Sequence, residues 1–267
     1  MVNIPTTTDP PLTKDTVLSI NQRHIQGAYD RQNIGDLNSM KSSGTNPVPL
    51  RNTPPRDTAR TGYPPANRTT PTAPPQKPPV MPMPPLLNEA RKGQKVPLAA
   101  AEKHPRFCVG VGWNVLDQNC DVDVSAFLLR NGRVLGDAWF VFYGQEESPD
   151  GSTVFSANSP PDRESISIDF ARLDPSADRI VFILTIHDAA EKRLNFSMIR
   201  DAYIRIIDAI SNREIVSFRI DEYYPTVISM TLGEIYLHNG TWKFNAVGNG
   251  VGKDLAGLCQ QYGVQVE

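Results

Sequence analysis

The residues best suited to chemistry in this sequence are the acidic side chains of residues 117–164. This segment holds nine carboxylates against three arginines, in a chain of 267 residues whose formal net charge is only -2. Its sharpest part is Asn-Cys-Asp-Val-Asp-Val-Ser at residues 119–125. Side chains on a strand alternate between its two faces, so Asn119, Asp121 and Asp123 are expected to point the same way. Neighbouring carboxylates repel each other unless a cation lies between them.

The oxygen donors around this motif suit a hard cation, calcium above all. Calcium takes about six to eight oxygen ligands in a flexible geometry, so one site can combine a strand with a long loop. We predict that residues 144–162 form that loop. The predicted ligands are Asn119, Asp121, Asp123, Asp150, Asn158, Asp162 and Glu164. Spacing alone leaves open the alternative that these acids form a solvated face that binds nothing.

The elements that must position these residues are short strands. Nine segments rich in β-branched and aromatic residues alternate with turn signals such as Asn131-Gly132 and Asn239-Gly240, which favour hairpins. The predicted strands are 106–113, 122–129, 138–142, 165–169, 179–186, 202–208, 214–219, 229–236 and 242–247. Two short helices are predicted over residues 196–200 and 253–262. The pattern therefore predicts a mainly β protein, an antiparallel β-sandwich with short helices.

The first third of the chain has a different composition. Of the 24 prolines in the sequence, about 17 lie before residue 86. Proline lacks a backbone donor and fixes φ, and few large apolar residues remain there to form a core. We predict a disordered, Pro-rich arm over residues 1–87, with a possible weak helix at 15–41, followed by a β-sandwich domain over residues 88–267.

Several motifs of the predicted domain resemble the TerD family of bacterial tellurium-resistance and stress proteins. Residues 109–114 (VGVGWN) resemble the family's GLGWD, residues 119–126 (NCDVDVSA) resemble its DFDLDASA, and residues 148–152 match its SPDGS. The resemblance covers residues 88–267, in order, and leaves out the arm. It implies a β-sandwich that binds calcium through the acidic cluster. The matching acidic positions are Asp121, Asp123, Asp150, Asp162 and Glu164, and Asn158 falls where the family has Asp-Asn.

The chain departs from the family pattern at three positions. Asn114 and Asn119 replace aspartates, and Arg163 replaces the middle acid of a DDE triplet. Each change removes negative charge or adds positive charge, which weakens the attraction for a cation. We therefore predict one calcium site instead of the family's two.

An enzyme is not predicted. The four histidines are His24, His104, His187 and His238, and none of them forms a recognisable metal motif or catalytic triad. The sequence His187-Asp188 has two interpretations, an acid–base pair or a strand end beside the acidic face. Residues 248–254 (GNGVGKD) approach a phosphate-binding loop, but Val247 and Asp254 occupy positions where that motif needs glycine and Ser/Thr.

The rest of the sequence indicates the cellular location and the classes of partner that we expect. No N-terminal signal pattern and no run of about 18 apolar residues is present, so we expect a cytoplasmic protein without membrane insertion. Peripheral membrane association stays open, and nothing in the charge suggests nucleic acid. The three cysteines are predicted to be small buried hydrophobes.

The predicted function is therefore that of a non-enzymatic, calcium-binding stress-response protein. Calcium would order the acidic loop, which would present a surface to protein partners of a stress-response complex. One alternative is a calcium-assisted module for a small ligand, a nucleotide or a glycan. Another is a scaffold whose metal site has degenerated.

Overall fold

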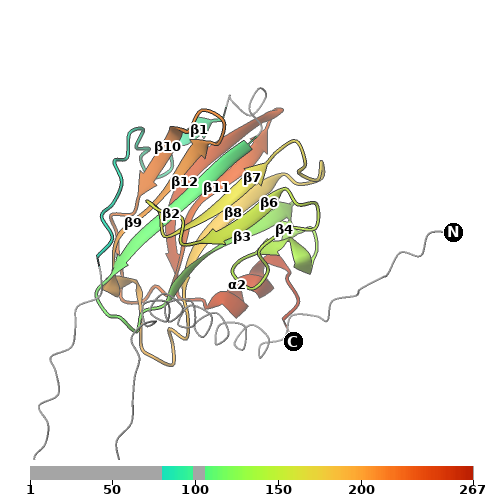
Figure 1. Cartoon of the computed structure of the whole chain (residues 1–267). Helices are drawn as coiled ribbons and strands as arrows, with labels where there is room; N and C mark the ends of the chain where they lie inside the picture. Colours follow the sequence, from blue (N-terminus) through green and yellow to red (C-terminus); the bar gives the residue numbers. More distant parts are fainter. Residues whose placement is uncertain (1–79, 99–105, 267) are drawn as a thin grey trace, which may run out of the picture. The chain divides into compact units, whose positions relative to one another are not determined.

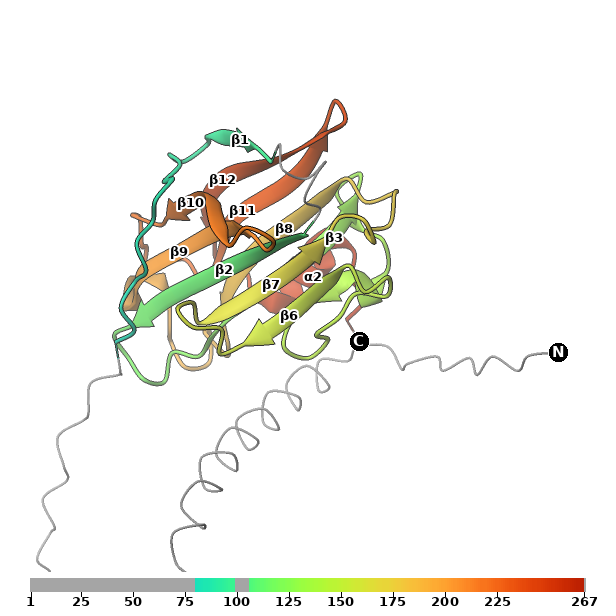
Figure 2. The ribbon, with the colours of Figure 1, turned by 45° about the horizontal axis from the view of Figure 1, so that its top comes forward.

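Two antiparallel β-sheets, stacked face to face, make up most of the chain that the computed structural model describes, residues 80–98 and 106–266 (Figures 1 and 2). The predictions for residues 1–79, including the weak helix at 15–41, lie outside the described residues. All pairs between named strands are antiparallel. The predicted fold class, a mainly β sandwich, is confirmed.

The larger sheet has seven strands in the order β1-β12-β11-β8-β3-β4, and β5 also pairs with β3. Its strands are β1 Lys95–Pro97, β3 Val122–Arg130, β4 Arg133–Val134, β5 Phe140–Val141, β8 Arg179–Ile186, β11 Ser229–His238 and β12 Thr241–Val251. Nearly every residue of β3 and β8 is buried. Both faces of these two strands are therefore covered, one by the smaller sheet and one by the C-terminal helix.

The smaller sheet has five strands in the order β10-β9-β2-β7-β6. Its strands are β2 Arg106–Val115, β6 Thr153–Ala157, β7 Glu164–Asp169, β9 Ile199–Asp208 and β10 Arg213–Arg219. Strand β2 lies in the middle, and its buried residues Phe107, Val109 and Val111 alternate with less apolar positions. This period of two places one face of β2 against the larger sheet.

The strand predictions hold except around residues 137–157. The predicted strand 138–142 is a 3-10 helix, η2 Asp137–Trp139, followed by the two-residue strand β5. The predicted loop 144–162 is interrupted by β6, which pairs with β7 from Thr153↔Ile168 to Ala157↔Glu164. Thr153 and Phe155 are buried, so the alternation of a strand is present there but short. The idea of one long loop is wrong for this reason.

The two predicted helices are present in shorter form. The first is a 3-10 helix, η3 Phe196–Met198, and the second is α2 Leu255–Tyr262. The Asp254 carboxylate accepts a hydrogen bond from the Gly257 N–H, which caps the start of α2, and Gly263 ends it with a left-handed φ of 88°. Tyr262 packs on Phe127 of β3, with ring centroids 4.7 Å apart, and so fixes α2 to the larger sheet.

The cysteines were predicted to be small buried residues, and the chain was predicted to lack a membrane helix. Cys120 and Cys259 are buried and Cys108 is half-buried, and all three are free thiols. Burial raises the pKa of Cys120 and of Cys259 to about 12, so neither is a ready nucleophile. None of the helices within the described ranges is long and apolar enough to cross a membrane.

Candidate functional site

Two acidic side chains from different sheets meet at the edge of β3. Strand β5 pairs with β3 only from Ala126 onward, so no strand of the described chain pairs with the edge before it. The Glu164 carboxylate, at the start of β7, accepts a hydrogen bond of 2.7 Å from the Val124 N–H at this edge. Asp123 is the neighbouring residue on β3. The contact thus brings a carboxylate of the smaller sheet beside a carboxylate of the larger one.

The electrostatics of this pair are unfavourable when both groups are ionised. Burial, and secondly the negative charge of Asp121, raise the pKa of Asp123 to about 8. Burial and the charge of Asp123 also raise the pKa of Glu164 well above its usual range, although the Val124 N–H opposes this effect. Neither carboxylate forms an ion pair within residues 80–98 and 106–266.

Tyr143 and the end of β8 adjoin the same carboxylates. Burial, followed by the charges of Asp123, Asp121, Asp188 and Glu164, raises the pKa of Tyr143. The backbone oxygen of Asp121 accepts a 2.9 Å hydrogen bond from the N–H of His187, which joins the start of β3 to the end of β8. Tyr143 was not predicted from the sequence, because it lies about twenty residues from the acidic motif and only the fold brings it close.

The side chains of His187 and Asp188 contact each other directly after the end of β8. The His187 Nε2 lies 2.9 Å from Asp188 Oδ2, and Lys192 Nζ lies 3.3 Å from the same oxygen. Asp188 also has a left-handed φ of 51°, unusual for a residue other than glycine. Because its carboxylate contacts both His187 and Lys192, Asp188 joins these two side chains within the loop that follows β8.

The structure places Asp162 apart from Glu164, although the two are close in sequence. Asp162 is buried, and its Oδ1 and Oδ2 each accept a 2.8 Å hydrogen bond from Arg205. The Tyr203 hydroxyl donates a third hydrogen bond, of 2.9 Å, to Oδ1. Asp162 lies over Gly110 of β2, where an added Cβ would come within 2.3 Å of its carboxylate. Its charge is therefore compensated by an arginine.

Asp150 is also held by its own surroundings. Its Oδ1 accepts hydrogen bonds from the Ser148 hydroxyl at 2.7 Å and the Ser152 N–H at 2.9 Å, and its Oδ2 accepts one from the Asp174 N–H at 2.8 Å. Partial burial opposes ionisation, but these hydrogen bonds outweigh it and lower the pKa of Asp150. The SPDGS motif thus forms a tight turn that closes on itself.

The two asparagines of the predicted ligand set lie at turns. Asn119 donates from both its backbone N–H and its side-chain Nδ2 to Asp117 Oδ1, each at 2.9 Å. Asn158 has a left-handed φ of 52° in the turn that follows β6. Neither side chain is joined by a described hydrogen bond to Asp123 or Glu164. The structure therefore brings Glu164 beside Asp123, with Asp121 two residues away in the chain, while Asn119, Asp150 and Asp162 are hydrogen-bonded to other partners. Asn158 directly follows Ala157, the register partner of Glu164.

Arg163, the basic departure from the family pattern, makes its contacts with Trp113, although its charge also acts to lower the pKa of Glu164. Its guanidinium lies over the Trp113 ring, 5.7 Å from the ring centroid, and Nε donates to the Trp113 carbonyl. Asn114 is engaged nearby, since its amide pairs with both the N–H and the carbonyl of Met81 at 2.9 and 3.0 Å. Asn114 and Arg163 thus stabilise one end of β2 and its contact with the segment before β1.

The oxygen donors of this region suit a hard cation, but few carboxylates lie close enough together to bind one. Asp121, Asp123 and Glu164 offer only oxygen, as calcium prefers. In the part of the chain that the structure describes, however, no group of three or more His, Cys, Asp or Glu side chains is already gathered for a metal ion. A cation at Asp123 and Glu164 would therefore need further oxygens from the backbone, hydroxyl groups or water.

The chain is similar in sequence to a family of resistance and stress proteins. A family model for the TerD domain matches residues 88–262. The chain is 38% identical over 183 residues to the tellurium resistance protein TerD of Serratia marcescens, which covers 65% of this chain and 95% of that protein. It is 34% identical over 186 residues to general stress protein 16U of Bacillus subtilis, with 66% and 96% covered. Over 138 residues it is 33% identical to chemical-damaging agent resistance protein B of Clostridium acetobutylicum, with 50% and 99% covered.

Proposed function

This chain belongs to the TerD domain family, and from that premise we propose that it is a calcium-binding stress-resistance protein without enzymatic activity. The observation that supports calcium most strongly is the meeting of Asp123 and Glu164, two poorly solvated carboxylates from different sheets. Neither has a cationic partner among the described residues. Bound calcium would supply the missing positive charge.

The proposed role of each residue follows from its position. Asp123 and Glu164 would bind the cation directly, one from each sheet, and Asp121 would add negative charge nearby. Because the Glu164 carboxylate already accepts the Val124 N–H, its orientation is fixed before any ion arrives. Asp162 and Asp150 are left out of this proposed set, since Arg205 and the SPDGS turn occupy their oxygens.

The effect on the fold would be to join the two sheets at this edge. The cation would stabilise the contact between β3 and β7, and with it the adjoining loop that begins at His187. Partner proteins of a stress response would then recognise the ordered surface. The names of the relatives, which refer to resistance to tellurium, to general stress and to chemical damage, support this setting for the present chain.

Melting curves of the full chain, recorded in calcium and in chelator, test the proposal. A ligand at 100 times its dissociation constant that binds only the folded state adds about 2.7 kcal/mol to the free energy of unfolding. For a domain of this size that corresponds to a rise in melting temperature of about 5–11 °C. Asp123→Asn and Glu164→Gln should abolish the rise, and Asp123→Asn should also raise the melting temperature in chelator by relieving repulsion.

Asp150→Asn is the matched control, because it makes the same chemical change at a carboxylate whose oxygens are already used. Its melting temperature should still rise in calcium by the full amount. If the wild-type chain shows no rise, the protein does not use calcium, and the scaffold alternative takes its place. If Asp150→Asn loses the rise while Asp123→Asn keeps it, calcium binds at the SPDGS turn.

A further inference from the structure

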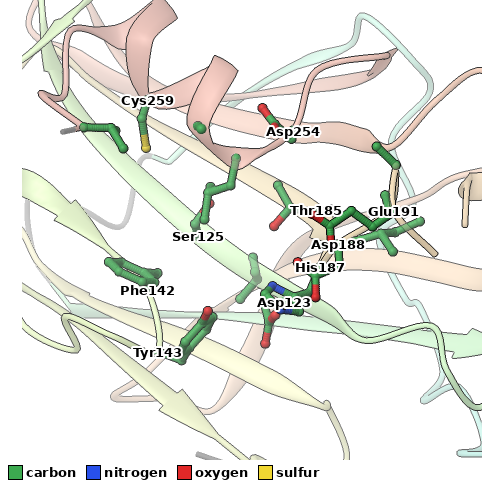
Figure 3. A pocket seen from close by; sticks show the side chains of 17 residues that line it. Asp123, Ser125, Phe142, Tyr143, Thr185, His187, Asp188, Glu191, Asp254 and Cys259 are labelled. Atoms are coloured by element: carbon green, nitrogen blue, oxygen red, sulfur yellow. Dashed lines mark ion pairs between the residues drawn. The ribbon is translucent and has the colours of Figure 1, made fainter. Parts of the chain in front are cut away.

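A pocket lies beside Asp123, between the larger sheet and helix α2 (Figure 3). It has a volume of about 160 Å³. Its floor is formed by β3 and the end of β8, one wall by the loop that starts at His187, and its roof by the first turns of α2. Glu164 does not line it, so the pocket and the carboxylate pair share only Asp123.

The floor of this pocket contains a buried hydroxyl group without a partner. Ser125 is 2% exposed, and its Oγ makes no hydrogen bond with any described residue. Figure 3 shows Ser125 on the strand beneath α2, on the same side as Asp123. Burial of an unpaired hydroxyl group is unfavourable, and such a group in a native pocket calls for a partner. A ligand in the pocket would provide one.

The charge around the pocket selects the kind of ligand. Its lining contains four acids, Asp123, Asp188, Glu191 and Asp254. No lysine or arginine among the described residues lines it. Asp188 is held by His187 and Lys192, and Asp254 caps α2. Asp123 and Glu191 have neither a hydrogen bond nor an ion pair within the described part of the chain. Glu191 is exposed to solvent, so Asp123 is the carboxylate that lacks compensation inside the pocket.

Most of the remaining lining is apolar and would contact the apolar part of a ligand, although Tyr143, Thr185 and His187 also line the pocket. Phe142 and Ile186 border the pocket from the sheet, and Leu255 and Ala256 from α2. Most small-molecule sites combine such apolar walls with a few convergent polar groups. An ammonium group has three donors in a small volume, which suits one carboxylate and one hydroxyl group two residues apart on a strand.

We propose that this pocket binds a small primary amine, with its ammonium group between Asp123 and Ser125 and a compact apolar body beneath α2. The inference goes beyond calcium binding and does not depend on it, although both use Asp123. A cation carried on an apolar body would satisfy the Ser125 hydroxyl group and offset the acidic lining together. A neutral apolar molecule would leave the acidic lining uncompensated, and a bare metal ion would leave the apolar walls of the pocket without a contact.

Three probes with the same ring and different charge test the proposal. Benzylamine, benzyl alcohol and benzoate are titrated separately into the full chain in chelator by calorimetry. Benzylamine should bind at least about tenfold more tightly than benzyl alcohol, because hydrogen bonds between charged groups are the stronger ones, and benzoate should not bind. Equal affinity for benzylamine and benzyl alcohol, or no binding of benzylamine, would overturn the proposal.

Two serine variants place the site. Ser125→Ala should weaken benzylamine binding by about tenfold or more. Ser217→Ala is its matched control, because Ser217 is also buried with an unpartnered Oγ but lies on β10, outside the pocket. If the two variants bind benzylamine equally well, the amine binds elsewhere. Ala256→Leu, which fills the pocket from α2 with a good helix former, should abolish binding, and retained binding would again contradict the proposal.

A calcium titration of the same chain keeps the two proposals separate. Heat from calcium without heat from benzylamine would overturn the amine pocket alone. Heat from benzylamine without heat from calcium would overturn the calcium site alone. If both bind, calcium should weaken benzylamine binding, because the two compete for the Asp123 carboxylate.

Discussion

Removal of the Asp162 carboxylate distinguishes a structural residue from a calcium ligand. In the fold, Asp162 receives two hydrogen bonds of 2.8 Å from Arg205 and one of 2.9 Å from Tyr203. The side chains of Asp162 and Arg205 are only 5% and 13% exposed. Asp162→Ala therefore leaves a largely buried guanidinium without its counter-charge, a change that typically costs about 3–5 kcal/mol.

The expected loss is large enough to measure by thermal or urea unfolding. For a domain of this size, the melting temperature should fall by about 6–20 °C. Glu222→Ala is the control, since it removes an ion pair with Lys92 whose side chains are 53% and 55% exposed. That variant should change the free energy of unfolding by less than about 1 kcal/mol, because exposed pairs contribute little.

Calcium affinity of the same variant completes the test. If Asp162 is structural, Asp162→Asn should bind calcium within about threefold of the wild type, at a temperature where both are folded. A variant that loses calcium binding while its melting temperature in chelator stays unchanged would refute the reasoning. Asp162 would then be a ligand, as the family resemblance implies, and Arg205 would have to move away from it.

Three further predictions concern packing, pH and the helix cap. Gly112→Ala should destabilise the fold by about 1–3 kcal/mol, measured by urea unfolding, because its Cβ would lie 2.4 Å from the Tyr203 ring; an unchanged midpoint would contradict this close contact. Without calcium, protonation of Asp123 stabilises the fold fully below about pH 4, and this contribution is lost as the pH rises through about 8. Melting temperatures in chelator should follow that trend, with a flatter profile in Asp123→Asn, and equal profiles would argue against the raised pKa. Asp254→Ala should cost about 1 kcal/mol by removing the cap that accepts the Gly257 N–H, and no loss in urea unfolding would mean that packing alone holds α2.

The regular elements were predictable because their apolar residues form either a continuous buried run or a regular spacing. Strand β8 has the same bounds as the predicted segment 179–186, a continuous apolar run. The helix α2 was predictable from the spacing of Leu255, Leu258 and Cys259, of which the last two are buried. Strand β6 was missed because its five residues follow a run of turn formers and read as part of a polar loop.

The grouping of the acids was harder to predict, because it depends on the direction in which each side chain leaves a turn. Asp162 and Glu164 are two residues apart and would share a face on a continuous strand. A turn before β7, with a hydrogen bond from the Asp162 N–H to the Ser159 carbonyl, breaks that alternation. Glu164 pairs in register with Val111, while Asp162 lies over Gly110, whose partner is Arg205.

Residues from distant parts of the chain complete the site, and a single sequence does not pair them. Ser125 was visible within the NCDVDVS motif, but only the fold shows that its hydroxyl group is buried without a hydrogen-bond partner among residues 80–98 and 106–266. Arg205 lies in a segment that resembles the family, but the sequence alone indicated no partner for it, and its role follows from its register with Gly110 on β2. The acidic segment therefore predicted the region of the site, and the tertiary fold decides which acids belong to it.

Calorimetric titration of calcium into the full wild-type chain and into Glu164→Gln tests the central claim most directly. We predict one calcium ion per chain for the wild type and no binding heat for the variant. The reason is that Glu164 is the carboxylate of the smaller sheet that lies beside Asp123. Two tight ions per chain, no heat from the wild type, or undiminished binding in Glu164→Gln would contradict it.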